Sequence, residues 1–208
     1  MKKENGGFTL VELLISLTIL VIIGIAISSF LYTSTRQYSA ASTETTLQTE
    51  AQMVQNQLQN RILEVSKGIY MPASGGFYQD GRQIELYGKQ GTTGEKIRIA
   101  FDSSKGELLY TRYELKESLD AGGRKLYEWE PDAEATEELF ASYVTGFSVD
   151  LCDGEGNPIS ESDKGNTVEQ VKISISYELN QKKQESYFVV TPRNTVIVSD
   201  EVGALYGD

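Results

Sequence analysis

Two hydrophobic patterns follow each other in the first third of the chain. From Leu13 to Thr35 no residue is charged and most residues are apolar. The hydrocarbon core of a membrane needs about 20 apolar residues at helical rise, so this run predicts a membrane-spanning helix. A secretory signal peptide has an apolar region of only about 7–15 residues that ends in a small-residue cleavage site, and the run does not fit that class.

The second pattern is an amphipathic stripe that continues the same helix. Its apolar residues recur every three or four positions and are Leu47, Ala51, Val54, Leu58, Ile62, Val65 and Ile69. The residues off the stripe, expected to face solvent, are Gln48, Gln52, Gln55, Gln59 and Asn60. Lys67 and Gly68 suit the end of this helix near Ser66, with the glycine in a left-handed cap. This second part of the helix has too many polar residues to be stable alone. We therefore expect the downstream domain to pack on its apolar stripe.

After Pro72 the pattern changes to short alternating segments separated by turn signals, which predicts a mainly antiparallel sheet. The expected strands are 83–87, 96–101, 107–115, 125–129, 146–152, 168–179, 186–190 and a weaker 195–198. One face of strand 168–179 carries Val171, Ile173, Ile175 and Tyr177, and 180–184 is expected to be a polar hairpin turn. The fold class is therefore α+β: a long N-terminal helix, transmembrane in its first half, packed on a mainly antiparallel sheet.

An acidic stretch interrupts the predicted strands and consists of Glu128, Glu130, Asp132, Glu134, Glu137 and Glu138. The apolar residues that follow are Leu139, Phe140, Tyr143 and Val144, which predict a short helix docked on the sheet. Acidic side chains are favourable at a helix N-terminus. We therefore prefer a solvated loop and helix start over an acidic partner-binding loop.

Composition restricts the function classes. The formal net charge is −11, and a broad nucleic-acid surface is not expected, because phosphate binding needs clustered Lys and Arg. The chain has no histidine and one cysteine, Cys152, so Ser–His and Cys–His catalytic pairs are impossible and zinc lacks its usual ligands. We expect no enzyme and no cofactor. Cys152 is expected to be a small buried residue on a strand, with an intermolecular disulfide as the alternative.

One loop has a partial calcium-binding pattern. Oxygen-bearing side chains alternate from Asp153 to Asn157. Pro158 occupies the position of the sharp-turn glycine, however, and Lys164 that of the bidentate acid. A glycine-rich hairpin turn is therefore the expected structure, without a metal. The twelve tyrosines and Trp129 admit an adhesive aromatic surface, although aromatic residues are common in sheets anyway.

The most informative residues directly precede the apolar run, in the order Gly7-Phe8-Thr9-Leu10-Val11-Glu12-Leu13. Glu12 is an acid inside an apolar segment, where an unpaired charge is costly and indicates a functional site. This stretch resembles the processing site of type IV pilins and of the pseudopilins of type II secretion and competence systems. The resemblance implies cleavage by a prepilin peptidase between Gly7 and Phe8 and methylation of the new amino terminus on Phe8. Glu12 would be the fifth residue of the mature chain, where the family has its characteristic acid.

The resemblance divides the chain into a leader (1–7), a transmembrane and filament-core helix (8–31), its amphipathic continuation (32–68) and a globular antiparallel β domain (69–208). A buried carboxylate is tolerable only when paired, so Glu12 in a filament core needs a positive partner. The amino terminus of Phe8 in a neighbouring subunit is the expected one, which makes Glu12 an assembly residue. The apolar core would be formed by Leu10, Leu13, Leu14, Ile15, Leu17, Ile19, Leu20, Val21, Ile22, Ile23, Ile25 and Ile27.

Later segments sharpen the resemblance. Segments 139–153 and 188–194, together with the chain's size, resemble the J-type minor pseudopilins and the W-type minor pilins. The sequence departs from the major-pilin pattern at Ser29, where major pilins usually have a proline, and it lacks the cysteine pair of many major subunits. Both departures favour a low-copy subunit over the bulk component of the filament, and we expect its place to be at or near the tip.

The partners implied are other pilin or pseudopilin subunits, the prepilin peptidase and the pilus assembly platform in the cytoplasmic membrane. Lys2 and Lys3 place the amino end in the cytoplasm by the positive-inside bias, so the β domain lies outside and later in a surface filament. Which machine is involved, a pilus, a type II secretion pseudopilus or a competence pseudopilus, stays open. One alternative is a binding module or adhesin on a pilin stem, marked by a groove on the sheet face away from the helix. A membrane-anchored enzyme would instead need a deep pocket with convergent acids.

Overall fold

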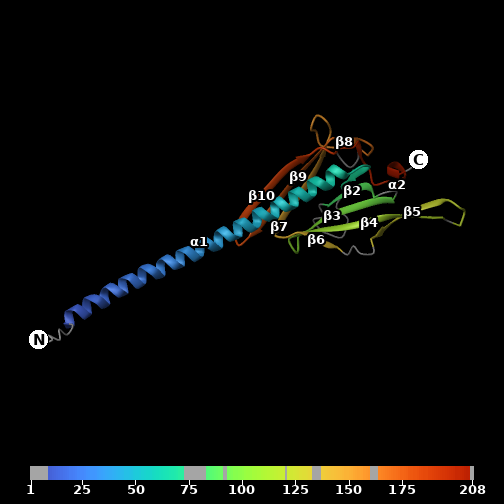
Figure 1. Ribbon diagram of the computed structural model, residues 1–208. Helices are drawn as coiled ribbons and strands as arrows, with labels where there is room; N and C mark the ends of the chain where they lie inside the picture. Colours follow the sequence, from blue (N-terminus) through green and yellow to red (C-terminus); the bar gives the residue numbers. More distant parts are fainter. Residues whose placement is uncertain are drawn as a thin grey trace, which may run out of the picture. The chain divides into compact units, whose positions relative to one another are not determined.

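The computed structural model describes residues 9–72, 83–90, 93–119, 121–132, 137–159 and 164–206. Helix α1 (Leu10–Glu64) comes first and the short helix α2 (Val202–Tyr206) comes last (Figure 1). The strands between them are β1 (Gly68–Tyr70), β2 (Gln83–Gln90), β3 (Thr93–Asp102), β4 (Glu107–Leu119), β5 (Lys125–Pro131), β6 (Glu138–Ala141), β7 (Val144–Cys152), β8 (Thr167–Val168), β9 (Gln170–Leu179), β10 (Lys182–Val190) and β11 (Val196–Val198). The chain divides into two compact units, Met1–Glu44 and Thr45–Asp208.

The described part of the first unit is the N-terminal part of α1. Among the described residues, α1 is the helix that is long and apolar enough to cross a membrane, judged by length and composition. Its polar side chains bond within the helix: the hydroxyls of Ser16 and Thr18 donate to the carbonyls of Glu12 and Leu14, each at 2.8 Å. Such bonding suits a lipid environment, which offers no water to polar groups.

The second unit is built on the predicted stripe of α1. Leu47, Ala51, Val54, Leu58 and Ile62 are all buried, at 0–5% exposure, so the predicted packing of this part of the helix on a sheet is confirmed. The sheet residues that meet this core include Ile84, Leu86, Ile97, Ile99, Leu108, Val171, Ile173, Ile175 and Tyr177. The last four share one face of β9, as expected from their alternation.

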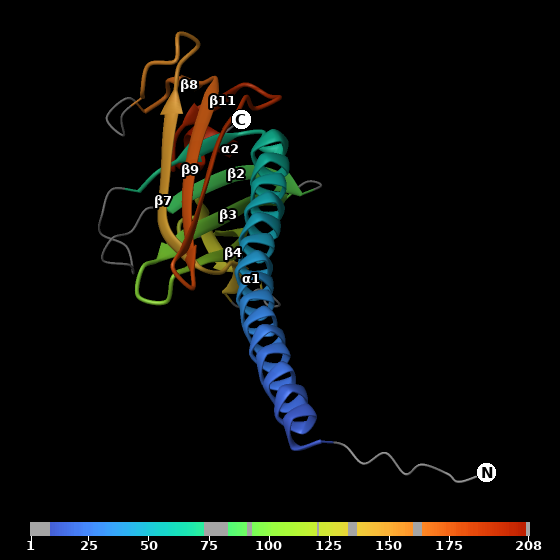
Figure 2. The ribbon, with the colours of Figure 1, turned by 90° about the vertical axis from the view of Figure 1, so that its left-hand side faces the viewer.

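Two sheets supply these residues. The larger has the order β5-β4-β3-β2-β1-β11-β8, with β6 also paired to β4, and the smaller has the order β10-β9-β7. All pairs are antiparallel except β1 with β11, which is parallel. Figure 2 shows β2, β3 and β4 crossing behind the carboxyl-terminal part of α1, with β7 and β9 running along it. The α+β class is thus as predicted.

The predicted end of the helix is wrong in its details. α1 ends at Glu64, and Gly68 is not a left-handed cap but the first residue of β1, paired with Tyr87 and Ile197. A Cβ on Gly68 would lie 2.5 Å from Cδ2 of Leu205 and 3.2 and 3.3 Å from the carbonyl oxygens of Ile197 and Ser199, so a larger residue would force these neighbours to shift. Gln55 does not simply face solvent either, because its Oε1 accepts a hydrogen bond from Ser186 at 3.3 Å.

The predicted short helix after the acidic stretch is also wrong. Leu139 and Phe140 lie in strand β6, which pairs with the first half of β4, and Val144 begins β7. Tyr143 makes the connection with a positive φ of 61°. The pairing with β4 outweighs the local helical spacing. Glu134 lies outside the described residues.

The predicted hairpin between β9 and β10 is confirmed, with a tighter turn. Asn180 and Gln181 form it with φ values of 49° and 66°, and β10 begins at Lys182. Positive φ at both central residues is typical of the type I′ turn that suits the twist of paired strands.

Candidate functional site

The N-terminal end of α1 is capped by the side chains of two residues, Thr9 and Glu12. Thr9 precedes the first helical residue, and its Oγ1 accepts a hydrogen bond from the backbone N–H of Glu12 at 3.3 Å. In return, Oε2 of Glu12 accepts hydrogen bonds from the backbone N–H and the hydroxyl of Thr9, each at 3.2 Å. This is a capping box, in which side chains satisfy backbone donors that the first helical turn leaves free.

Within the described residues, the Glu12 carboxylate is stabilised by its own helix. The partial positive charge of the helix N-terminus stabilises an acid in the first turn. Among the described residues, Glu12 has no ion pair and its second oxygen, Oε1, has no hydrogen-bond donor. Within the described part of the chain, one carboxylate oxygen is therefore available to a cationic partner.

The sequence-predicted processing residues, Gly7 and Phe8, lie outside the described residues. The involvement of Thr9 was missed by the sequence analysis. A signal for it existed, because Thr9 and Glu12 match the Ser/Thr-x-x-Glu pattern that marks a capping box at a helix start.

The predicted core residues of the helix lie on an uncovered surface. The apolar side chains from Leu10 to Leu31 are each more than half exposed, and Leu10 reaches 79%. Soluble proteins rarely leave so large a continuous apolar surface open to water, so it marks an interaction with a membrane or with other proteins. The residues it includes are Leu13, Leu14, Ile15, Leu17, Ile19, Leu20, Val21, Ile22, Ile23, Ile25 and Ile27.

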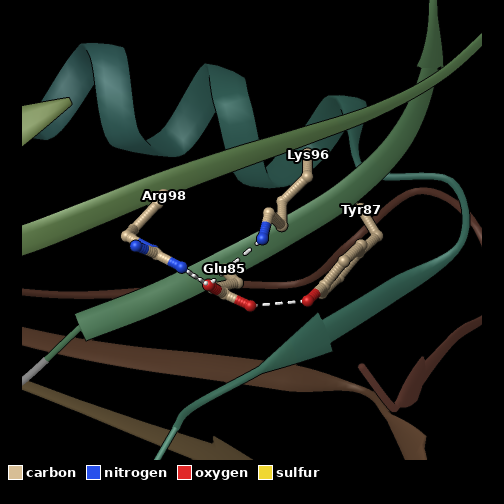
Figure 3. A network of polar contacts seen from close by, with 4 residues as sticks. All are labelled: Glu85, Tyr87, Lys96 and Arg98. Carbon is tan, nitrogen blue, oxygen red and sulfur yellow. Dashed lines mark hydrogen bonds and ion pairs between the residues drawn. The ribbon is translucent and has the colours of Figure 1, made fainter. Parts of the chain in front are cut away.

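A second polar cluster lies in the β domain, around Glu85 on β2 (Figure 3). Glu85 Oε1 accepts hydrogen bonds from Nε and Nη2 of Arg98, at 2.9 and 2.7 Å, and lies 3.6 Å from Nζ of Lys96. Its other oxygen accepts a hydrogen bond from the hydroxyl of Tyr87 at 2.5 Å. The cross-strand register explains the cluster, because Glu85 pairs with Arg98 and Tyr87 with Lys96.

The electrostatics of this cluster point to a structural role. Burial lowers the pKa of Lys96, and the nearby Glu85 charge opposes this effect. The pKa of Tyr87 is raised, mainly by burial and to a smaller extent by the Glu85 charge. Nζ of Lys96 also lies 4.4 Å from the ring centre of Tyr113 and 5.5 Å from that of Trp129. Because every group is held by neighbours in the sheet, the cluster stabilises the β domain and offers no free nucleophile.

A cleft of about 500 Å³ lies beside the carboxyl-terminal part of α1. The residues that α1 contributes are Gln57, Asn60, Arg61 and Glu64, spaced three and four apart, and the opposite wall is formed by Tyr110, Glu138, Leu139 and Phe140. The Arg61 guanidinium lies 5.4 Å from the ring centre of Tyr110, whose ring stacks with that of Phe140. The Tyr110 hydroxyl is buried.

The partial calcium pattern forms a turn. Asp153 Oδ1 accepts hydrogen bonds from the backbone N–H groups of Glu155 and Asn157, at 3.0 and 2.8 Å, and Gly156 has a φ of 84°. The bonds from Asn157 are the main reason that the pKa of Asp153 is lowered. Among the described residues no group of three His, Cys, Asp or Glu side chains is placed to hold a metal ion. Cys152, next to this turn, is buried at the end of β7, as predicted.

Comparison with known families places the first helix in context. Residues 2–28 match the family described as the prokaryotic N-terminal methylation motif. The match includes Gly7, Phe8, Glu12 and most of the apolar run, and it supports a type IV pilin-like precursor. In the comparison with curated proteins, no protein matches the chain.

Proposed function

We propose that this chain is a minor pilin or pseudopilin. A prepilin peptidase cleaves it between Gly7 and Phe8 and Phe8 becomes N-methylated. The subunit then joins other pilin-like subunits on an assembly platform in the cytoplasmic membrane. The observation that carries this proposal is the uncovered apolar part of α1, Leu10 to Leu31, which has one acid at its start and lies mostly within the matched methylation motif of residues 2–28. The role is structural and needs no cofactor.

The apolar helix has two successive environments in this mechanism. Before assembly it lies in the membrane, with the amino end in the cytoplasm. In the filament it packs against equivalent helices, which keeps its side chains away from water. Leaving one large apolar side chain exposed to water would cost about 1.5–3 kcal/mol, so the helix has no stable position outside a membrane or a filament core.

Glu12 gives this packing its register. Transfer of an unpaired carboxylate to an apolar core is prohibitive, whereas a carboxylate paired with an ammonium group is tolerated. Each mature subunit supplies one amino terminus at Phe8 and one carboxylate at Glu12. Pairing of Glu12 with the terminus of the adjacent subunit would fix the axial offset between neighbouring helices.

A low-copy position near the filament tip is supported by the sequence and by the helix. Major pilins usually have a proline at the position of Ser29. Here α1 continues unbroken through Ser29, whose carbonyl accepts a hydrogen bond from the hydroxyl of Thr33 at 3.0 Å. The resemblance to J-type pseudopilins and W-type minor pilins points the same way. Quantitative mass spectrometry of purified filaments tests this role: a minor subunit is present at a small fraction of the major pilin, and near-equal amounts would contradict it.

Two substitutions test the processing and the pairing. Gly7→Val places a branched side chain at the cleavage junction and should leave the precursor uncut when the peptidase is co-expressed, which appears as an unshifted band on a gel. Glu12→Ala should be cut normally but should enter sheared filaments poorly. Normal incorporation of the Glu12→Ala variant would contradict the pairing mechanism.

The cleft beside α1 favours a second candidate, a binding module carried on a pilin stem. Arg61, Tyr110 and Phe140 place a cation and stacked rings beside several hydrogen-bonding side chains. The cleft differs from the groove expected from the sequence because α1 itself forms one of its walls. If Arg61→Ala leaves filament assembly intact but abolishes adhesion of the cells to a surface or glycan, the binding module is favoured over a purely structural subunit.

A further inference from the structure

We propose that Thr9 is a positioning residue for Glu12 during assembly. The inference rests on the proposed function, in which the Glu12 carboxylate pairs with the amino terminus of a neighbouring subunit. The backbone N–H and the hydroxyl of Thr9 hold Oε2 of Glu12, both at 3.2 Å, while Oε1 has no donor among the described residues. One carboxylate oxygen is thus fixed by the chain itself and the other receives the incoming ammonium group.

The hydrogen bonds reduce the freedom that Glu12 loses on pairing. An exposed glutamate samples several rotamers, whereas these bonds direct the carboxylate toward the N-terminal end of its own helix. A group that is already ordered loses less entropy when it binds. The same bonds lower the cost of carrying the carboxylate at the edge of an apolar segment, since a polar group without hydrogen bonds is expensive there.

The capping box is compatible with the proposed cut. The bond that is cut joins Gly7 to Phe8, so Thr9 becomes the second residue of the mature chain and keeps its amide N–H. A cut one residue later would turn this N–H into a charged amino terminus beside the Glu12 carboxylate of the same chain, which would compete with pairing between subunits. In this proposal Thr9 holds Glu12 in the same way before and after processing, and the amino group that the cut creates on Phe8 pairs with the Glu12 of a neighbour.

Thr9→Val tests the inference, because it removes the hydroxyl and retains the shape and the backbone N–H. We expect normal processing and about a five-fold lower incorporation into sheared filaments, the equilibrium effect of losing one typical hydrogen bond to the Glu12 carboxylate. Thr9→Ser retains the hydroxyl and should restore incorporation. Ser16→Ala is the matched control, because that hydroxyl bonds the carbonyl of Glu12 and not its carboxylate.

A double variant distinguishes positioning from a separate role. If Thr9 acts through Glu12, Thr9→Val should cause no further loss of incorporation in a Glu12→Ala background. An independent, additional loss in that background would overturn the inference. The NMR signal of the Thr9 amide, recorded for the full chain in detergent micelles, should move in Glu12→Ala and stay in place in Ser16→Ala. An unmoved signal in Glu12→Ala would show that the capping box is absent.

The pairing of Glu12 and the positioning role of Thr9 can be refuted separately. Wild-type incorporation of Glu12→Ala would refute the pairing in the proposed function and, with it, the role of Thr9. Impaired Glu12→Ala together with wild-type incorporation of Thr9→Val would refute the role of Thr9 alone and leave the pairing intact.

Discussion

Replacement of Glu85 by alanine tests how the β domain is held together. The Glu85 side chain is 6% exposed and is the shared partner of Arg98, Lys96 and Tyr87. Removing one partner of a buried ion pair costs about 3–5 kcal/mol, because the remaining charge is buried without compensation. The Arg98 side chain is 31% exposed, so solvent compensates part of its loss. We therefore expect a free energy of unfolding lower by about 3 kcal/mol, the lower end of that range.

The assay is urea unfolding of the full chain in a mild detergent, followed by tryptophan fluorescence. Trp129 is the single tryptophan, and its ring lies 5.7 Å from that of Tyr87, so the signal reports this part of the sheet. Glu117→Ala is the matched control, because the Glu117–Lys125 pair joins side chains that are 48% and 59% exposed. An exposed pair contributes about 0–1 kcal/mol. A Glu85→Ala variant as stable as the Glu117→Ala control would refute the role assigned to the cluster.

Two further predictions concern the helix and the turn after β7. Leu58→Ala, at a fully buried position of the helical stripe, should lower the free energy of unfolding by about 2–5 kcal/mol in the same assay, whereas the exposed Asn56→Ala should change it by less than about 0.5 kcal/mol. Equal effects would contradict the packing of this face on the sheets. Because the pKa of Asp153 is lowered from 3.8 in the folded protein, its hydrogen bonds stabilise the fold at higher pH and this stabilisation is lost as the pH falls through and below 3.8. Asp153→Asn should therefore reduce the fall in stability at acidic pH, and an unchanged pH profile of unfolding would refute this linkage.

How far the sequence predicts this fold depends on how local each signal is. The stripe from Leu47 to Ile62 repeats at helical spacing within one segment, and the turn at Asn180 separates two alternating segments, so both could be recognised from neighbouring residues. Strand β1 has only three residues, and its parallel partner is β11, near the other end of the chain. Short strands of this kind are defined by distant pairing and leave no local pattern.

The candidate site shows the same contrast. Glu12 stands out in the sequence because a single acid in an apolar run is costly, whatever the fold. The cluster around Glu85 depends on the register of β2 against β3, since a shift of one residue would move Glu85 to the opposite face. The cleft beside α1 depends on where β6 lies, and the local pattern of that segment predicts a helix instead of a strand. Sites that arise from strand register and long-range pairing therefore cannot be recognised from the sequence and become visible only in the structure.

The most direct test of the central claim is the mass of the N-terminal peptide of the mature protein, isolated from cells that contain an active prepilin peptidase. Under the proposed function, the mature chain begins at Phe8, carries one methyl group on its amino terminus and retains the whole apolar helix. A mature chain that begins after that helix, or one that still carries residues 1–7, would contradict it.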